Sequence, residues 1–280
     1  MRMKTLTLAC IFGLVLLPVL GFACDSGTPL DSLEKIKSDR RIKVGYISYS
    51  DITSRDSQTG QVKGFLVDVL YEALADLNIP KENVEFVETD WQNFSLGLDT
   101  QKYNLSIAGT FNTPVRAQAV DFSRPIFYLG NGAVVKQDDN RFHSIEDFNK
   151  DDITIAVVQG EQGYEYAKKN LPKVKLISLS GSDLSIAPLQ VKLGKADAAL
   201  SDQYILRKYV NSNPQVKDAL ANNPYDVLPI CWAVRKNNSQ DASLLDYINA
   251  QLDRLESSGR LSEIMAKYSS KIPFAKKPAK

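Results

Sequence analysis

Arg116 is the residue whose type and position most directly suggest chemistry in this chain. It follows a buried strand that is expected to end at Gly109, and Pro114 favours the start of a helix just before it. A cation is unfavourable at the positive end of a helix, so Arg116 is badly placed for stability and well placed to bind an anion. Its guanidinium and free backbone N–H groups predict a receptor for a small acid. The alternative is a surface arginine paired with Asp121 or Glu88.

Signatures of catalysis are scarce. The single histidine, His143, lies in a polar stretch and cannot form a multi-histidine metal site. Residues 130–132 (Gly-Asn-Gly) are half of a dinucleotide fingerprint without a following helix, and we interpret them as a flexible crossing. We expect no metal, no cofactor and no nucleophile-based catalysis, whereas acid–base chemistry by carboxyl groups stays open.

The first 23 residues have the pattern of a secretion signal. Arg2 and Lys4 precede an almost uncharged apolar run at residues 6–20, and residues 21–23 are suited to a signal peptidase. We therefore assign residues 1–23 to a signal peptide and residues 24–32 to a polar linker. The mature chain is expected in the periplasm or another extracytoplasmic space.

Cys24 allows two forms of the mature N-terminus. The stretch before it resembles a bacterial lipoprotein signal, in which this cysteine carries the lipid anchor, and a plain cut after Ala23 is the alternative. Cys10 would leave with the signal, so only Cys231 could form a disulfide with Cys24. Because Cys231 lies in an apolar strand, where free cysteines are common, we expect no disulfide.

The charge balance does not favour polyanionic partners. The formal net charge of the chain is +1, and loss of Arg2 and Lys4 would bring the mature chain to about −1. We therefore expect a monomer that binds a small molecule and neither nucleic acid nor an anionic membrane surface.

Hydrophobic periodicity predicts two successive α/β units. In the first unit we expect strands near residues 43–49, 84–87 and 105–108 and helices near 62–78 and 94–98. In the second we expect strands near residues 153–158, 174–179 and 196–200 and helices near 163–170 and 189–193. A strand near 227–234 and helices near 244–255 and 261–268 follow.

This order predicts an α/β fold with two lobes joined by a two-strand hinge. Lobe 1 is expected to combine residues 33–129 with 227–274, and lobe 2 to span residues 130–226. Residues 275–280 would form a flexible tail. Ligands of such sheets bind beyond the carboxyl ends of the strands, so two facing lobes place two such edges across one cleft.

A series of short segments carries a family resemblance. They occur, in order, at residues 42–45, 60, 64–68, 91, 98, 108–110, 113–116, 120–123, 147–148, 155–157, 159–160, 194–199, 202 and 259. Through them the chain resembles the bacterial extracellular solute-binding proteins of family 3, the periplasmic receptors of polar amino-acid ABC transporters. The resemblance extends from Leu33 to Tyr268 and implies a hinged receptor, without catalysis, that closes on its ligand and serves a membrane permease.

The resemblance also implies roles for individual residues. Arg116 would hold the α-carboxylate of the ligand, and Asp202 would hold the α-ammonium from the opposite lobe. Trp91 would form a wall of the side-chain pocket, or else be a core residue behind the strand. Asp202 can also be a helix N-cap, and the two roles can coexist. The turn at residues 108–110, with Gly109 and Thr110, would lie beside the ligand.

Three departures from the family pattern concern the site. Glu161 stands where a Ser or Thr usually receives the α-carboxylate, Phe111 stands where a hydroxyl is common, and Ser50 begins an unusual mouth at residues 50–54. Two carboxylates about 4 Å apart would repel by roughly 4 kcal/mol at an effective dielectric constant near 20. Glu161 would therefore turn outward, or the ligand would bring a cation, or Arg116 would already be paired.

The altered residues favour a ligand with an acid group for Arg116 and an amine or guanidinium elsewhere. Aromatic amino acids, which could pack on Phe111 and Trp91, come next, and acidic amino acids are least favoured. The alternative function is a periplasmic cyclohexadienyl or prephenate dehydratase-like enzyme on the same fold, with Glu161 as general acid.

Overall fold

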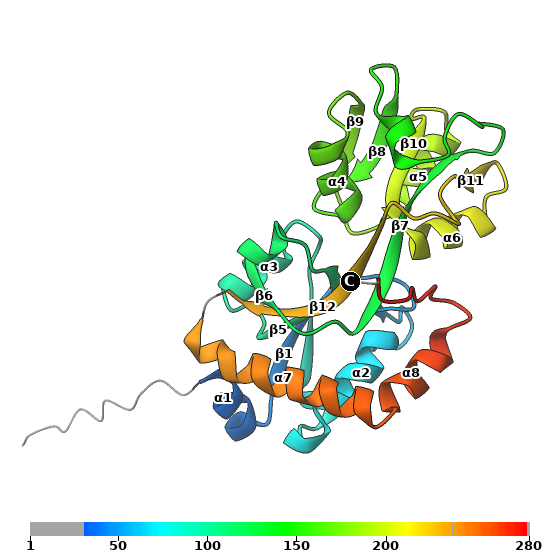
Figure 1. Ribbon diagram of the computed structural model, residues 1–280. Coiled ribbons are helices and arrows are strands. Elements are labelled where there is room, and N and C mark those ends of the chain that lie inside the picture. The colour runs from blue at the N-terminus through cyan, green and yellow to red at the C-terminus, as the bar shows by residue number, and fades with distance from the viewer. Residues whose placement is uncertain (1–30, 237, 279–280) are drawn as a thin grey trace, which may run out of the picture. The chain divides into compact units, whose positions relative to one another are not determined.

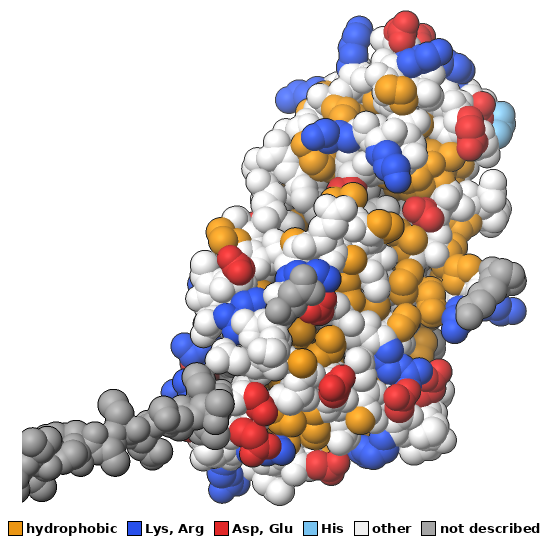
Figure 2. Space-filling model, turned by 60° about the vertical axis from the view of Figure 1, so that its left-hand side comes forward, with side chains coloured by type: hydrophobic (Ala, Val, Ile, Leu, Met, Phe, Trp, Pro, Cys, Tyr) orange, Lys and Arg blue, Asp and Glu red, His pale blue; other side chains and the backbone are white. Residues whose placement is uncertain are grey.

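The computed structural model describes residues 31–236 and 238–278 (Figure 1). The predicted signal peptide, most of the linker and Cys24 lie outside the described residues. Within the described ranges, no helix is both long enough and apolar enough to cross a bilayer. On the face visible in Figure 2, basic and acidic side chains are interspersed, in keeping with the balanced charge of the sequence.

The first lobe is built on three parallel strands. β1 (Ile42–Tyr46) lies between β4 (Val84–Glu88) and β5 (Leu105–Phe111), and every residue of β5 is buried. Burial of a whole strand is typical of a parallel sheet covered on both faces. The helices of this lobe are α1 (Ser32–Asp39), α2 (Phe65–Ala73), α3 (Phe94–Asp99), α7 (Ser239–Ser257) and α8 (Arg260–Tyr268) (Figure 1).

The second lobe repeats this arrangement. β8 (Thr154–Val158) pairs in parallel with β10 (Ala198–Asp202) and with β9 (Lys175–Leu179). Alternate residues of β8 enter different hydrophobic clusters, because successive side chains of a strand point to opposite faces. One cluster includes Ala167 of α4, and the other includes residues of α5 and α6. These helices span Gln162–Asn170, Ile186–Lys192 and Gln203–Asn211, respectively.

Two long antiparallel strands cross between the lobes. β7 (Phe127–Lys136) and β12 (Asp226–Arg235) pair from Asn131 with Asp226 to Phe127 with Ile230. Beyond this segment, β12 pairs with β5 and β7 pairs with β10, so both sheets merge into one in the order β4-β1-β5-β12-β7-β10-β8-β9. The short strands are β6 (Val120–Phe122) beside β12, β11 (Val216–Asp218) beside β7, and the ribbon of β2 (Ser54–Arg55) with β3 (Val62–Lys63).

The crossing differs from the expectation drawn from its glycines. Gly130, Asn131 and Gly132 lie inside β7 and not in a flexible segment. The side chains of Gln203 and Asp218 occupy the space that a Cβ would need at Gly130 and Gly132, respectively. The two glycines therefore allow the side chains of Gln203 and Asp218 to pack closely against β7.

Three further expectations about local structure were wrong. The strand before the ligand turn continues to Phe111, although Gly109 has a φ of +68°. The helix expected over residues 62–78 begins only at Phe65, because Gly64 has a φ of +132° and the main chain of Ile52 fills its Cβ position. The helix expected from Pro114 is a single 3₁₀ turn, Arg116–Gln118.

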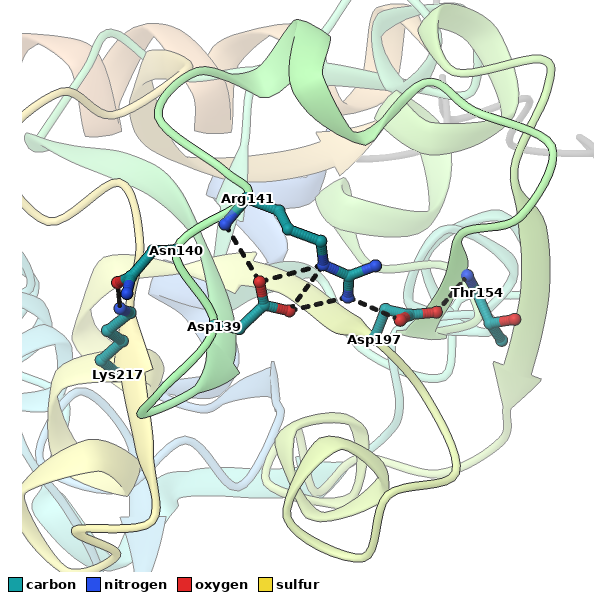
Figure 3. A network of polar contacts seen from close by, with 6 residues as sticks. All are labelled: Asp139, Asn140, Arg141, Thr154, Asp197 and Lys217. Atoms are coloured by element: carbon teal, nitrogen blue, oxygen red, sulfur yellow. Dashed lines mark hydrogen bonds and ion pairs between the residues drawn. The ribbon is translucent and has the colours of Figure 1, made fainter.

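A polar network fixes the outer end of lobe 2 (Figure 3). Arg141 contacts the carboxylate of Asp139 at 2.7 Å and that of Asp197 at 2.8 Å. Asp197, just before β10, also accepts a hydrogen bond from the backbone N–H of Thr154 at 2.9 Å. The Arg141 guanidinium keeps the pKa of Asp139 below its usual value. This network joins the starts of β8 and β10, whose other ends reach the cleft.

Candidate functional site: a charged cavity between the lobes

A small cavity lies between the lobes, beyond the carboxyl ends of β5 and β10. Its volume is about 10 Å³, which is about the smallest space that can hold one water molecule. Its walls come from both lobes: Tyr49, Trp91, Gly109, Phe111, Arg116, Glu161, Gln162, Leu184 and Asp202. The lobes are therefore closed, and a ligand of amino-acid size requires them to separate.

Arg116 enters this cavity from lobe 1 and is 5 % exposed. Its guanidinium crosses to lobe 2, where Nε contacts Glu165 at 3.0 Å and Nη2 donates to the carbonyl of Gly160 at 2.6 Å. Because Arg116 is nearly buried and its guanidinium pairs with Glu165, the alternative of a surface arginine was wrong. Its backbone N–H donates to Thr113 Oγ1 at 3.3 Å, which leaves the guanidinium as the group for an anion.

Asp202 enters from lobe 2 as the last residue of β10 and is 1 % exposed. It is also the N-cap of α6 and accepts a hydrogen bond from the Ile205 N–H at 3.0 Å, as the sequence allowed. Burial raises the pKa of its carboxyl group, and a hydrogen bond from Tyr49 partly offsets this rise. Asp202 can therefore receive a cation on its cavity side while it caps the helix.

Glu161 is the N-cap of α4 and is only 2 % exposed. Its Oε2 accepts from the Gly163 N–H at 2.6 Å, whereas its Oε1 is buried without a hydrogen-bond partner among the described residues. Burial, and then the charge of Asp202, raise the pKa of Glu161 to about 8. The sequence left open whether Glu161 turns outward, whether the ligand brings a cation, or whether Arg116 is already paired. The outward orientation of Glu161 is wrong, and Arg116 is already paired with Glu165.

Aromatic side chains and polar contacts seal the cleft around the charged groups. Trp91 packs edge to face on Tyr49 with the ring centroids 5.5 Å apart, and its indole N–H donates to the Ser182 carbonyl at 3.1 Å. Tyr49 also meets the ring of Tyr204, whose hydroxyl donates to Asp51 at 2.8 Å. Trp91 is thus both nearly buried and part of the cavity wall.

The eight predicted ligand residues separate into three groups. Six of them line the cavity: Trp91, Gly109, Phe111, Arg116, Glu161 and Asp202. Ser50 does not; it lines a neighbouring pocket of about 550 Å³ and is hydrogen-bonded to Lys208. Thr110 is buried and lines neither space, because its side chain lies on the opposite face of β5 from that of Phe111.

Four important residues were missed from the sequence. Tyr49, Gln162 and Leu184 line the cavity, and Glu165 pairs with Arg116. Glu165 lies four residues after Glu161, one helical turn away, and that spacing could have identified it. No comparable signal marks Leu184, which comes from a connection of lobe 2.

The remaining reactive groups do not add a second chemical centre within the described ranges. His143 is exposed, and Cys231 is a buried free thiol whose pKa burial raises to about 12. In the part of the chain that the structure describes, His, Cys, Asp and Glu side chains form no group of three suited to a metal ion. The cavity between Arg116 and the two acids is thus the candidate site.

Two lobes linked by crossing strands, with charged groups from both lobes in one closed cavity, define a hinged receptor for a small solute. Residues 42–271 match the family model of the bacterial extracellular solute-binding proteins, family 3, and the chain belongs to this family.

Individual relatives agree with this assignment. The ABC transporter glutamine-binding protein GlnH of Bacillus subtilis is 24 % identical over 97 % of this chain and 98 % of its own. The crystal structure of an ancestral amino acid-binding protein, a precursor of cyclohexadienyl dehydratase, is 28 % identical with a TM-score of 0.73, covering 85 % of this chain and 99 % of its own. The cyclohexadienyl dehydratase of Pseudomonas aeruginosa is 22 % identical over 75 % of each chain.

Proposed function

We propose that this protein is the extracytoplasmic receptor of an ABC transporter and captures a small acid that carries an amine. The observation that carries the proposal is the burial of Arg116 and Asp202, from opposite lobes, in one cavity. A zwitterion that bridges these groups stabilises only the closed state, which couples binding to hinge motion.

The carboxylate of the ligand would replace protein groups on Arg116. In the closed structure Nε of Arg116 contacts Glu165, whose side chain is 21 % exposed, and Nη2 reaches the Gly160 carbonyl. When the lobes separate, Glu165 can return to water at little cost, whereas Arg116 can bind a planar carboxylate with two parallel hydrogen bonds. Because the carboxylate of the ligand takes the place of Glu165, Arg116 has an anionic partner both without and with ligand.

The amine of the ligand would be held on lobe 2. Asp202 offers a buried carboxylate with a hydrogen-bonded neighbour, Tyr49, at the cavity wall. Trp91 and Phe111 supply apolar surface for the carbon skeleton between the two charged groups. The partner for delivery would be a membrane permease, and a monomer without nucleic acid suffices for this role. Lipid on Cys24 would keep the receptor near that permease.

Replacement of Arg116 tests this assignment. Arg116→Ala removes a charge-assisted contact worth about 1.5 to 3 kcal/mol. The affinity for the best amino-acid ligand should therefore decrease by a factor of about ten to more than a hundred. Calorimetry with that ligand, chosen from a thermal-shift panel, measures the change. Arg260→Ala is the control, because Arg260 pairs with Glu72 and Glu263 in lobe 1, away from the cavity. Unchanged affinity of Arg116→Ala would refute the role of Arg116.

A second candidate function is dehydration of a cyclohexadienyl acid, and the buried carboxyl group of Glu161 favours it, because burial raises its pKa. With a pKa of about 8, Glu161 could donate a proton to a leaving group in a closed cavity. Incubation with prephenate, followed by detection of phenylpyruvate, separates the functions. Turnover that disappears in Glu161→Gln would establish the enzyme, and we expect no turnover from the receptor.

A further inference from the structure

Glu161 combines an ordinary local role with an unusual environment. N-cap residues usually lie at the surface, where the second oxygen of an acidic cap is in water. Here Oε2 of Glu161 caps α4 by accepting a hydrogen bond from the Gly163 N–H. Because Glu161 is buried between the closed lobes, its Oε1 is removed from water. A buried carboxylate oxygen without a donor is costly, so this site lacks a group that the ligand can supply.

Acidic side chains, Glu161 among them, outnumber basic ones in the cavity. Asp202, also buried, faces the same cavity and disfavours a second negative charge on Glu161. Arg116 is the cation among the described residues lining that cavity, and its hydrogen bonds go to Glu165, Gly160 and Phe111. Glu165 balances Arg116, so two carboxyl groups, Glu161 and Asp202, are left for cationic partners.

An ordinary zwitterion cannot satisfy both acids. Its ammonium group pairs with Asp202, and its carboxylate takes the place of Glu165 on Arg116. Glu161 would then have to stay protonated, or remain as a buried, unpaired charge. A ligand with a second cationic group removes this conflict, because one further ammonium or guanidinium can donate to Oε1.

We propose that Glu161 is a specificity-determining residue that accepts this second cationic group, so that the site selects dibasic amino acids over neutral ones. The inference rests on the proposed receptor function and narrows its ligand class. It depends on the free Oε1, the shared cavity with Asp202 and the prior pairing of Arg116. A proton on Glu161 is the competing way to neutralise the site, and neutral ligands would have to bind to that form.

Matched ligand pairs test the proposal. L-Arginine and L-citrulline have nearly the same shape but differ by one charge, and L-lysine and L-norleucine differ by the terminal ammonium. In calorimetry at pH 7.5 the wild type should prefer the charged member of at least one pair by about tenfold or more. Glu161→Gln keeps an oxygen for the Gly163 N–H and removes the charge, so this preference should fall to less than about threefold.

Controls separate this inference from the receptor function. Glu146→Gln removes an exposed acid from the same lobe outside the cavity, and its ligand preference should equal that of the wild type. Melting curves establish that Glu161→Gln is folded. Equal wild-type affinity within both pairs, or a preference that survives in Glu161→Gln, overturns the inference. If the wild type binds a ligand and Arg116→Ala does not, the receptor function stands even when the inference about Glu161 is overturned. Failure of all four compounds to bind the wild type overturns the dibasic ligand class.

Discussion

At the scale of single residues, the chemistry of the site depends on how protons and cations are shared among buried acids. Glu161 has an ordinary pKa of 4.5, which rises to about 8 in the folded protein, because burial disfavours its charged form. Folding therefore favours the protonated acid. The stability that this provides is complete below about pH 4.5, decreases as the pH rises, and is lost above about pH 8.

Urea denaturation of wild type and Glu161→Gln at pH 5, 6.5 and 8 can measure this effect. Relative to the variant, the wild-type free energy of unfolding should decrease with pH, with an upper limit of about 1.4 kcal/mol per pH unit. Comparison with the variant isolates Glu161 from groups such as Asp51, whose pKa is lowered and whose contribution has the opposite sign. Parallel pH profiles would show that Glu161 ionises normally in the folded state.

The residue types of the site could be read from the sequence more easily than their partners. Arg116, Asp202 and Glu161 were identified as a group because their motifs occur in a recognised order. The pairing of Arg116 with Glu165 joins residues 49 positions apart on different lobes, and no local pattern determines such a contact. Whether Glu161 faced inward also depended on lobe closure, which is a property of the tertiary structure.

At the scale of elements, the turn before α4 controls how closely the lobes approach. Gly160 has a φ of +79°, and a Cβ on it would lie 2.7 Å from the main-chain carbonyl of Trp91 in the other lobe. Its carbonyl oxygen also accepts from Arg116. The absence of a side chain at Gly160 therefore allows the contact that closes the cavity.

Gly160→Ala should impair closure without preventing folding. Gly194→Ala is the matched control, because Gly194 has a φ of +72° but nothing within 4 Å of its Cβ position. Each variant should lose about 1 to 2 kcal/mol of stability through backbone strain. Only Gly160→Ala should also bind ligand at least about tenfold more weakly, as measured by calorimetry. Equal ligand affinities of the two variants would contradict this role of Gly160.

Most elements, but not their ends, followed from the sequence. The alternation of strands and helices predicted both α/β units, because hydrophobic period and breakers are local properties. The start of α2 depended on Gly64, whose Cβ position is filled by the main chain of Ile52, and β5 continues through Gly109 to Phe111 although Gly109 has a positive φ. Similarly, residues 130–132 became part of β7 because β12 and β10 supply hydrogen-bonding partners from elsewhere in the chain.

At the scale of the whole described molecule, contacts between the lobes occupy the groups that the proposed ligand would use. Arg116 contacts Glu165 at 3.0 Å, and Thr113 Oγ1 donates to the same carboxylate at 3.4 Å. The Trp91 indole and the Tyr204 hydroxyl make further contacts across the cleft. Such contacts favour the closed form, and the proposed ligand would have to compete with them for Arg116.

Glu165→Gln should therefore open the ligand-free protein. The variant leaves Arg116 buried without its anionic partner, which removes a contact worth about 1.5 to 3 kcal/mol from the closed form. Small-angle scattering should give a larger radius of gyration than the wild type without ligand and the same value with saturating ligand. Glu263→Gln, which breaks an exposed pair within lobe 1, is the control. An unchanged radius of ligand-free Glu165→Gln would mean that this pair does not hold the lobes together.

A crystal structure of the protein grown with its tightest-binding amino acid would show whether the carboxylate of the ligand replaces Glu165 on Arg116. We predict that the ligand lies between the lobes, with its carboxylate about 2.7–3.2 Å from the Arg116 guanidinium nitrogens and its amine on Asp202. Glu165 should have left Arg116 in that structure. A ligand bound outside the cleft, or an Arg116 still paired with Glu165 beside a ligand held by other groups, would contradict the proposed binding mode.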